Sequence, residues 1–211
     1  RDKRYDGMII TGAPVENLDF AEVDYWEELS QIMQWSRTHV YSTLHICWGA
    51  QAGLYYHYGI QKHPLKKKVS GIFQHDIVDA TCPLFHGFDD VFYAPHSRYT
   101  EVYAEDIRSN DDLLLLATSK EAGVFAAQSL DARQVFIFGH PEYDAMTLAL
   151  EYKRDIGRGL TIDVPQHYFP DDDPTQPPVV NWRSAAQLLY TNWLNYYVYQ
   201  ATPYDLREIE S

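Results

Sequence analysis

One of the two cysteines of this 211-residue chain lies where a strand-like stretch changes into a helix-like stretch. Cys47 follows the apolar run YSTLHI, residues 41–46, and precedes WGAQAGLYYHYG, residues 48–59, whose Ala, Gln and aromatic residues suit a helix. A sharp turn of this kind exposes the turn residue and aims the first N–H groups of the helix at it. We therefore expect Cys47 to be a nucleophilic thiolate, with the N–H of Trp48 stabilising an oxyanion on its acyl group. A small buried cysteine is the simpler alternative, but the Cys-x-Gly pattern at this turn favours the nucleophile.

A thiolate that transfers acyl groups needs a base, and the base needs a group that orients it. His140 follows the strand-like run QVFIF, residues 134–138, through a glycine. If that strand runs parallel to the strand before Cys47, both residues lie at the same edge of the sheet. Glu142 can turn back to the imidazole and fix its tautomer. The pattern predicts a triad of Cys47, His140 and Glu142, although a plain turn would also suit these residue types. Cys82, in DATCPLF, has no comparable context, and we expect it to be structural.

The elements that would carry these residues alternate at the start of the chain. Residues 5–12 (YDGMIITG) indicate a buried strand with a glycine turn, and residues 24–37 (DYWEELSQIMQWSR) indicate a helix. With the strand before Cys47 and the helix after it, this order predicts parallel strands joined by right-handed crossovers. Short strand-like runs between residues 71 and 139 predict antiparallel hairpins. The expected fold class is α/β, with a mostly parallel doubly wound sheet and antiparallel additions.

The later part of the chain returns to helix. Residues 144–157 (DAMTLALEYKRDIG) predict one helix, and residues 181–205 form an aromatic C-terminal helix block that other surface must cover. Such a surface favours self-association, so we expect a homodimer. We interpret residues 1–211 as a single domain. A doubly wound sheet usually carries a strand and a helix before the turn at Gly12, so the chain apparently lacks an N-terminal strand–helix portion.

The charge and the cysteine count exclude several kinds of protein. The chain has 30 acidic and 17 basic residues, a net charge of −13, and so negative a surface repels nucleic acid and anionic membranes. No apolar stretch approaches the length of a membrane span. Two cysteines cannot make a disulfide scaffold, so we expect a cytoplasmic protein. The sequence has no Cys/His cluster with the spacing of metal ligands, and we expect no metal site.

Several segments carry a resemblance to a known family. HICWGAQ with GHPE downstream resembles the class I glutamine amidotransferase fold, whose nucleophile elbow and His-Pro-Glu pair have this form. The fuller series DGMIITGAP, HICWGAQ, APHSRY, FGHPEYDA and WRSAAQLLYTNWLNYYVYQATPYDL, in this order, resembles the homoserine O-acyltransferases of the methionine pathway. The resemblance covers essentially all 211 residues. Members of that family are longer at the N-terminus by one strand–helix portion.

The resemblance implies a role for several side chains. Cys47 matches the acyl-thioester nucleophile of the family, and His140 and Glu142 match its histidine and glutamate. Substrate contacts carry over to Lys68 in KKKVSG, Ser97 in APHSRY and Arg154 in EYKRD. A guanidinium such as that of Arg154 can hold the homoserine carboxylate with two hydrogen bonds. We interpret the preceding lysines, residues 66 and 67, as a solvated charge run, which can also attract the phosphates of coenzyme A.

The resemblance also implies which acyl donor the protein uses, through the residue at position 16. In the family this position is typically Gly in succinyl users and Glu in acetyl users, and here it is Glu16. A glutamate fills the volume of a succinyl tail, and like charges near 4 Å at an effective dielectric of about 20 repel by roughly 4 kcal/mol. A solvated loop glutamate with no influence on the donor is the alternative interpretation.

The implied activity is acetyl transfer from acetyl-CoA to the γ-hydroxyl of L-homoserine. It would follow a ping-pong mechanism through a Cys47 thioester, with acetyl-CoA as co-substrate and no permanently bound cofactor. Three alternatives stay open: succinyl transfer from succinyl-CoA, a glutaminase domain that supplies ammonia to a synthase, and a non-catalytic binding module in which Cys47 is structural.

Overall fold

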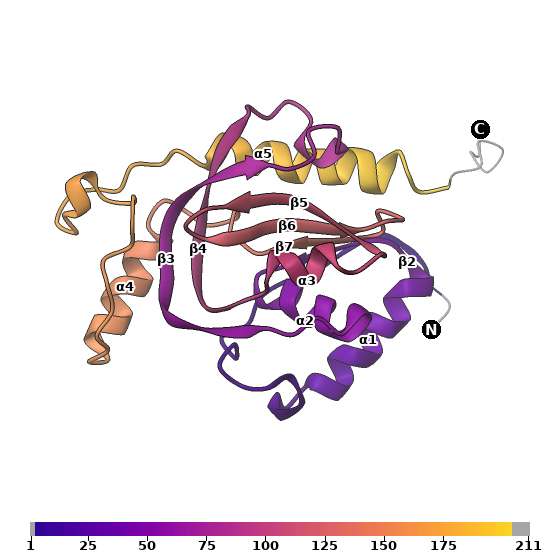
Figure 1. Cartoon of the computed structure of the whole chain (residues 1–211), viewed down its shortest axis with the longest axis horizontal. Coiled ribbons are helices and arrows are strands. Elements are labelled where there is room, and N and C mark those ends of the chain that lie inside the picture. Colours follow the sequence, from indigo (N-terminus) through magenta and orange to yellow (C-terminus); the bar gives the residue numbers. More distant parts are fainter. Residues whose placement is uncertain (1–2, 204–211) are drawn as a thin grey trace.

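In the part of the chain that the structure describes, seven strands form one continuous sheet (Figure 1). The structure is a computed structural model that describes residues 3–203. Along the sheet the order is β1-β2-β7-β6-β5-β3-β4. The strands are β1 (Tyr5–Ile10), β2 (Val40–Ile46), β3 (His63–Ile77), β4 (Val91–Glu101), β5 (Leu113–Ser119), β6 (Gly123–Ser129) and β7 (Gln134–Ile137).

Helices cover both faces of this sheet. In Figure 1, α1, α2 and α3 lie on one side of the sheet, α5 crosses the other side, and α4 lies beyond β3 and β4. The helices are α1 (Trp26–His39), α2 (Trp48–Tyr58), α3 (Ala104–Arg108), α4 (Thr147–Gly157) and α5 (Arg183–Asn192). Within residues 3–203, no helix combines the length and the apolar character that a bilayer crossing requires.

The α/β class is confirmed, but the sheet is mixed rather than mostly parallel. β1 pairs with β2, and β2 with β7, in parallel, whereas the other four neighbouring pairs are antiparallel. The short connections explain the difference. Residues 120–122 join β5 to β6 and residues 130–133 join β6 to β7, and segments this short can only reverse the chain. The parallel part is therefore limited to β1, β2 and β7. Cys47 directly follows β2, and His140 lies shortly after β7.

The aromatic C-terminal block is helical, as the sequence predicts. α5 continues as a π-helical segment, Trp193–Tyr199, while residues 204 and 205 of the predicted block lie outside the described residues. The Trp193 ring is buried and its indole N–H donates to the Ser42 hydroxyl at 3.0 Å, which fixes the segment against β2. Leu194 and Tyr199 remain exposed on this helix. The homodimer stays a prediction.

Candidate active site

Cys47 occupies a strained turn between β2 and α2. Its φ of 54° and ψ of −120° lie in a region that costs a residue with a side chain on the order of 1–3 kcal/mol. Backbone hydrogen bonds hold this conformation: the Cys47 N–H donates to the carbonyl of Ile137 at 2.7 Å, and its carbonyl accepts from Ala50 at 3.0 Å. The turn is thus fixed by β7 on one side and by the first turn of α2 on the other.

Two glycines allow the end of β1 to pass directly over this turn. A Cβ atom added to Gly49 would lie 2.5 Å from the carbonyl oxygen of Ile10, so no larger residue fits there. A Cβ atom on Gly12 would lie 3.2 Å from the Cβ of Cys47 and 3.5 Å from the backbone nitrogen of Trp48. The N–H of Trp48 belongs to the first turn of α2, where N–H groups have no acceptor within the helix. The loop at Gly12 and the start of α2 therefore enclose the Cys47 side chain from two sides.

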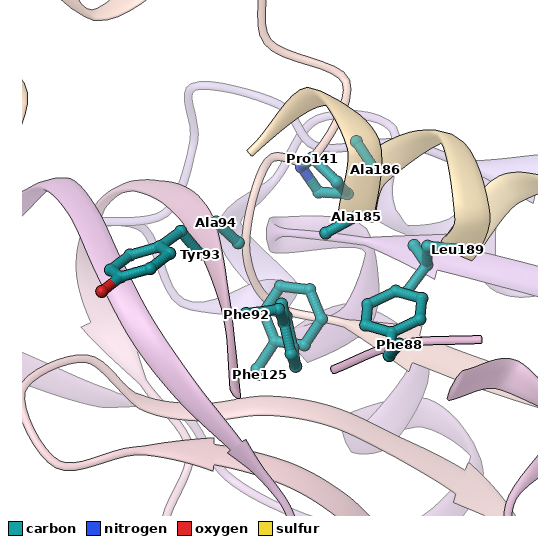
Figure 2. Close-up of a pocket in the computed structure, with 9 residues that line it drawn as sticks. All are labelled: Phe88, Phe92, Tyr93, Ala94, Phe125, Pro141, Ala185, Ala186 and Leu189. Carbon is teal, nitrogen blue, oxygen red and sulfur yellow. The ribbon is translucent and has the colours of Figure 1, made fainter. Parts of the chain in front are cut away.

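His140 is buried, and both its backbone and its ring are held by hydrogen bonds. Its backbone N–H donates to the Pro95 carbonyl at 2.7 Å, and its Nδ1 lies 2.7 Å from Oε1 of Glu142. Pro141, between the two, lines an apolar pocket with side chains of β4 and α5 (Figure 2), which anchors the turn. With Nδ1 occupied by Glu142, Nε2 is the nitrogen left for Cys47.

The charges around His140 control its protonation. Burial alone would lower its pKa, but hydrogen bonds and charge interactions with Cys47 and Glu142 raise the pKa of His140 to about 10. An imidazolium is therefore stable at neutral pH as long as Cys47 is a thiolate. The structure brings Cys47, His140 and Glu142 together as a Cys–His–Glu chain.

These three residues open into a cavity of about 450 Å³. Its lining also includes all the predicted substrate and donor residues, namely Glu16, Lys68, Ser97 and Arg154, which come from a loop, two strands and a helix. Trp48 lies beside this cavity, with its ring packed on Phe20 in the core.

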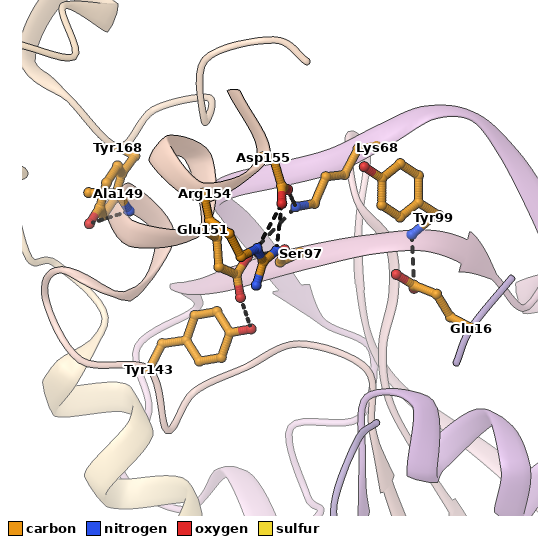
Figure 3. Close-up of polar contacts among 10 residues, drawn as sticks. All are labelled: Glu16, Lys68, Ser97, Tyr99, Tyr143, Ala149, Glu151, Arg154, Asp155 and Tyr168. Atoms are coloured by element: carbon orange, nitrogen blue, oxygen red, sulfur yellow. Dashed lines mark hydrogen bonds and ion pairs between the residues drawn. The ribbon is translucent and has the colours of Figure 1, made fainter. Parts of the chain in front are cut away.

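A cluster of acidic and basic side chains forms one wall of the cavity (Figure 3). Lys68, from β3, lies 2.9 Å from Oδ2 of Asp155 and 3.8 Å from Oε2 of Glu151, both on α4. The hydroxyl of Ser97, from β4, donates to the same Glu151 oxygen. The Nε and Nη2 atoms of Arg154 each lie 2.8 Å from Oδ1 of Asp155, while half of the Arg154 side chain stays exposed. The three predicted substrate residues thus share two carboxylates as partners.

The sequence prediction missed these two carboxylates. Glu151 and Asp155 are four residues apart on α4, and Arg154 lies between them, so all three share one helix face. That spacing was the available signal. Burial alone would raise the pKa of Asp155, but Lys68 and Arg154 beside it lower this pKa, so the carboxylate stays ionised.

Glu16 is fixed with its carboxylate facing the cavity. Its Oε2 accepts the backbone N–H of Tyr99 at 3.0 Å (Figure 3). Its backbone carbonyl accepts a hydrogen bond from the Lys62 ammonium. Burial raises the pKa of Glu16, and the Tyr99 N–H, Lys68, Arg98 and His140 oppose this shift. Glu16 therefore belongs to the same charge network as the base.

Two further predictions concern residues outside the Cys47 site: a structural role for Cys82, and the absence of a metal site. Cys82 is buried with its sulfur 3.2 Å from the Tyr197 hydroxyl, in surroundings that suit a structural residue. Across residues 3–203, no group of three His, Cys, Asp or Glu side chains is placed to hold a metal ion.

Comparison with known proteins places this site in a family. A sequence profile described as HTS, homoserine O-succinyltransferase, matches residues 1–204. The chain belongs to this family. A protein of Methanomethylophilus alvi named homoserine O-acetyltransferase is 61% identical over 209 residues, which are 99% of this chain and 68% of that protein. A protein of Acetivibrio thermocellus with the same name is 60% identical over 210 residues, which are 100% of this chain and 69% of that protein.

Solved structures with a similar fold are more distant in sequence. A glutamine amidotransferase of Methylobacillus flagellatus superimposes with a TM-score of 0.66 at 13% identity, over 98% of this chain and 81% of that chain. A glutamine amidotransferase of Thermotoga maritima gives a TM-score of 0.63 at 14% identity, over 89% and 76%. These two confirm the amidotransferase-like fold and, at this identity, nothing about activity.

Proposed function

We propose that the protein is a homoserine O-acetyltransferase, which moves the acetyl group of acetyl-CoA to the γ-hydroxyl of L-homoserine in methionine biosynthesis. The observation that carries the chemistry is the position of His140, bonded to Glu142 and facing Cys47 in a cavity lined by Glu16. The relatives named as acetyltransferases support the choice of donor.

The first half-reaction begins from the ion pair between the Cys47 thiolate and the His140 imidazolium. The thiolate attacks the carbonyl carbon of the thioester, and the N–H of Trp48 stabilises the oxyanion that forms. The intermediate then breaks the bond to the coenzyme A sulfur, which takes the proton of His140 and leaves as a thiol. Cys47 now carries the acetyl group and His140 is neutral.

The second half-reaction uses the change that acylation makes to His140. Two of the interactions that raise its pKa come from the Cys47 thiolate, and thioester formation removes that charge. The neutral imidazole can then act as a base. It takes the proton of the homoserine γ-hydroxyl as the oxygen attacks the thioester, and the Cys47 thiolate leaves as O-acetylhomoserine forms.

The charged wall of the cavity suits an amino acid. Asp155 holds the Arg154 guanidinium through its Nε and Nη2 atoms, and the rest of the group, on a half-exposed side chain, can hold the homoserine carboxylate. Glu151 is the carboxylate available for the ammonium, and it is already bonded to Ser97 and to Tyr143. Both ends of the zwitterion thus meet side chains of opposite charge on α4.

The choice between acetyl and succinyl donors rests on Glu16. Its carboxylate faces the acylation site, so a succinyl group would bring a second negative charge against it in a partly dehydrated cavity.

Both cysteines of the chain are free thiols. A nucleophilic thiol suits a reducing compartment, so we assign the enzyme to the cytoplasm.

The proposal is tested by the specificity constant, kcat/KM, for homoserine with acetyl-CoA and with succinyl-CoA, and by glutamine hydrolysis in the same preparation. We expect acetyl-CoA to be preferred by on the order of a hundredfold. A preference for succinyl-CoA would contradict the donor, and glutamine hydrolysis without acyl transfer would contradict the reaction.

A further inference from the structure

A second cavity adjoins the proposed active site. Its volume is about 370 Å³, and three residues line both cavities: Lys68, Tyr99 and Leu160. The rest of its lining comes from the start of β3, including Lys66 and Lys67, and from residues 160–166. A long substrate can therefore continue from the acylation site into this groove without leaving the protein surface.

The rim of this groove is basic, although the chain as a whole carries a net charge of −13. Lys66 and Lys67 lie on the groove itself, and the exposed Arg158 lines the neighbouring part of the active-site cavity. Among the described residues, neither Lys66 nor Arg158 has a carboxylate within 4 Å. Such a local cluster is what an anionic ligand needs in so acidic a protein.

The other two lysines on the groove differ in how strongly they are engaged. Lys67 lies 3.1 Å from Asp163, but the two side chains are 79% and 64% exposed, and such surface pairs contribute only about 0–1 kcal/mol. A phosphate can replace that partner. Lys68 is 9% exposed and is bonded to Asp155 between β3 and α4, so it belongs to the homoserine wall.

The cavity on the other side of Glu16 is less suited to an anion. Lys62 is the cation there, and its ammonium already donates to the carbonyl oxygens of Glu16 and Leu18 and lies over the Phe20 ring at 5.0 Å. The carboxylate residues Glu16 and Asp19 line the same cavity. A phosphate in that cavity would meet the negative charges of Glu16 and Asp19. The Lys62 ammonium could not balance this charge, because it is already bonded to the loop carbonyls.

We propose that the phosphates of acetyl-CoA bind at Lys66 and Lys67, with Arg158 beside them, and that the pantetheine arm runs past Tyr99 and Leu160 to Cys47. This site binds a nucleotide whose ribose carries phosphate at both its 3′ and its 5′ position. The proposal rests on the proposed function. It also separates the two substrates. Homoserine lies against α4, whereas the donor enters along β3 and residues 160–166.

The test compares acetyl-CoA with S-acetyl-N-acetylcysteamine, an acetyl thioester that has the end of the pantetheine arm but no phosphates. In the double variant Lys66→Glu/Lys67→Glu, we expect the KM for acetyl-CoA to rise by roughly tenfold or more, since two attractions become repulsions. The kcat/KM for the truncated thioester and the KM for homoserine should stay unchanged. The double variant Arg108→Glu/Lys120→Glu is the control matched for net charge, since both residues are exposed and lie outside both cavity linings.

A binding measurement reads the groove without any acyl transfer. Titration calorimetry with adenosine 3′,5′-bisphosphate, the phosphate-bearing half of the donor, should give binding to the wild type and to Arg108→Glu/Lys120→Glu. In Lys66→Glu/Lys67→Glu it should give a loss of roughly tenfold or more. Equal binding by all three proteins would overturn the groove assignment, as would an equal loss of activity with both thioesters. A wild type that binds the nucleotide and transfers no acetyl group from either donor would overturn the proposed reaction while supporting the groove.

Discussion

The ring of Tyr143 lies flat against the imidazole of His140, with centroids 4.2 Å apart and planes inclined by 16°. The hydroxyl of the same tyrosine donates to Oε1 of Glu151 at 2.7 Å. Tyr143 therefore connects the proposed base to the carboxylate that we assign to the homoserine ammonium. Its ring supports His140, which acts in both half-reactions, whereas its hydroxyl contacts only the homoserine wall. The two roles are therefore separable by mutation.

Tyr143→Phe should raise the KM for homoserine several-fold and leave the rate of acyl-enzyme formation unchanged, because the ring stays and only the bond to Glu151 is lost. Tyr143→Leu should slow acylation as well, since a stacked aromatic pair is worth about 0.5–1.5 kcal/mol. Rapid-quench measurements of the first half-reaction, with steady-state kinetics, distinguish the two. A Phe variant as slow in acylation as the Leu variant would show that the hydroxyl, rather than the ring, supports His140.

Glu142→Gln should lower kcat by roughly a hundredfold and still leave measurable activity, because it removes the carboxylate charge beside Nδ1 of His140 but not the base itself. His140→Ala should be more damaging. Since Glu142 is one of the groups that raise the pKa of His140, the Gln variant should also lose activity at a lower pH on the alkaline side. A Glu142→Gln enzyme with unchanged kinetic constants and an unchanged pH profile would remove Glu142 from the triad.

Replacements of Glu16 separate the effect of volume from that of charge. Glu16→Gly removes both and should gain succinyl-CoA use by on the order of a hundredfold in kcat/KM. Glu16→Gln keeps the volume and removes only the charge, so an intermediate gain is expected. If neither variant changes the ratio of the two donors, the side chain at this position has no part in donor selection.

Acid should destabilise the fold through its buried histidines. Burial lowers the pKa of His75 to about 3, whereas an unfolded histidine titrates near 6.5. Below pH 6.5 the unfolded chain therefore binds a proton that the folded chain does not, and stability falls as pH falls toward 3. His75→Phe, which keeps an aromatic ring beside Phe92 and Phe125, should reduce this slope by at most about 1.4 kcal/mol per pH unit.

Urea unfolding of both proteins at several pH values between 4 and 8 measures this slope. The comparison uses the slope rather than the absolute stability, because the variant also loses the 2.9 Å contact between His75 and His96. Parallel stability curves for wild type and variant would mean that His75 titrates alike in the folded and unfolded chains.

The local chemistry of the elbow could be predicted from the sequence because it depends on neighbouring residues. Cys47 follows an apolar run and is followed by Gly49, which the close approach of Ile10 requires. The helix α2 begins at Trp48 and ends before Gly59. The φ of 72° at Gly59 is the left-handed backbone conformation in which glycine commonly ends a helix. These signals are short-range, and the structure agrees with them.

The long-range pairs could not be predicted from the sequence in this way. Lys68 meets Asp155 across 87 residues and Ser97 meets Glu151 across 54, because the register of β3 and β4 sets which side chains face α4. The antiparallel majority of the strand pairs could not be predicted for the same reason. A short apolar run indicates a strand but not its neighbour, and β7 pairs with β2 although four other strands lie between them in the sequence.

The acyl-enzyme on Cys47 tests the central claim most directly. The protein is incubated with acetyl-CoA without homoserine, and its intact mass and peptide map are measured before and after homoserine is added. We predict one acetyl group on the peptide that contains Cys47, its loss when homoserine is added, and no adduct in Cys47→Ala. An acetyl group on Cys82, no adduct at all, or transfer by Cys47→Ala at the wild-type rate would contradict the mechanism.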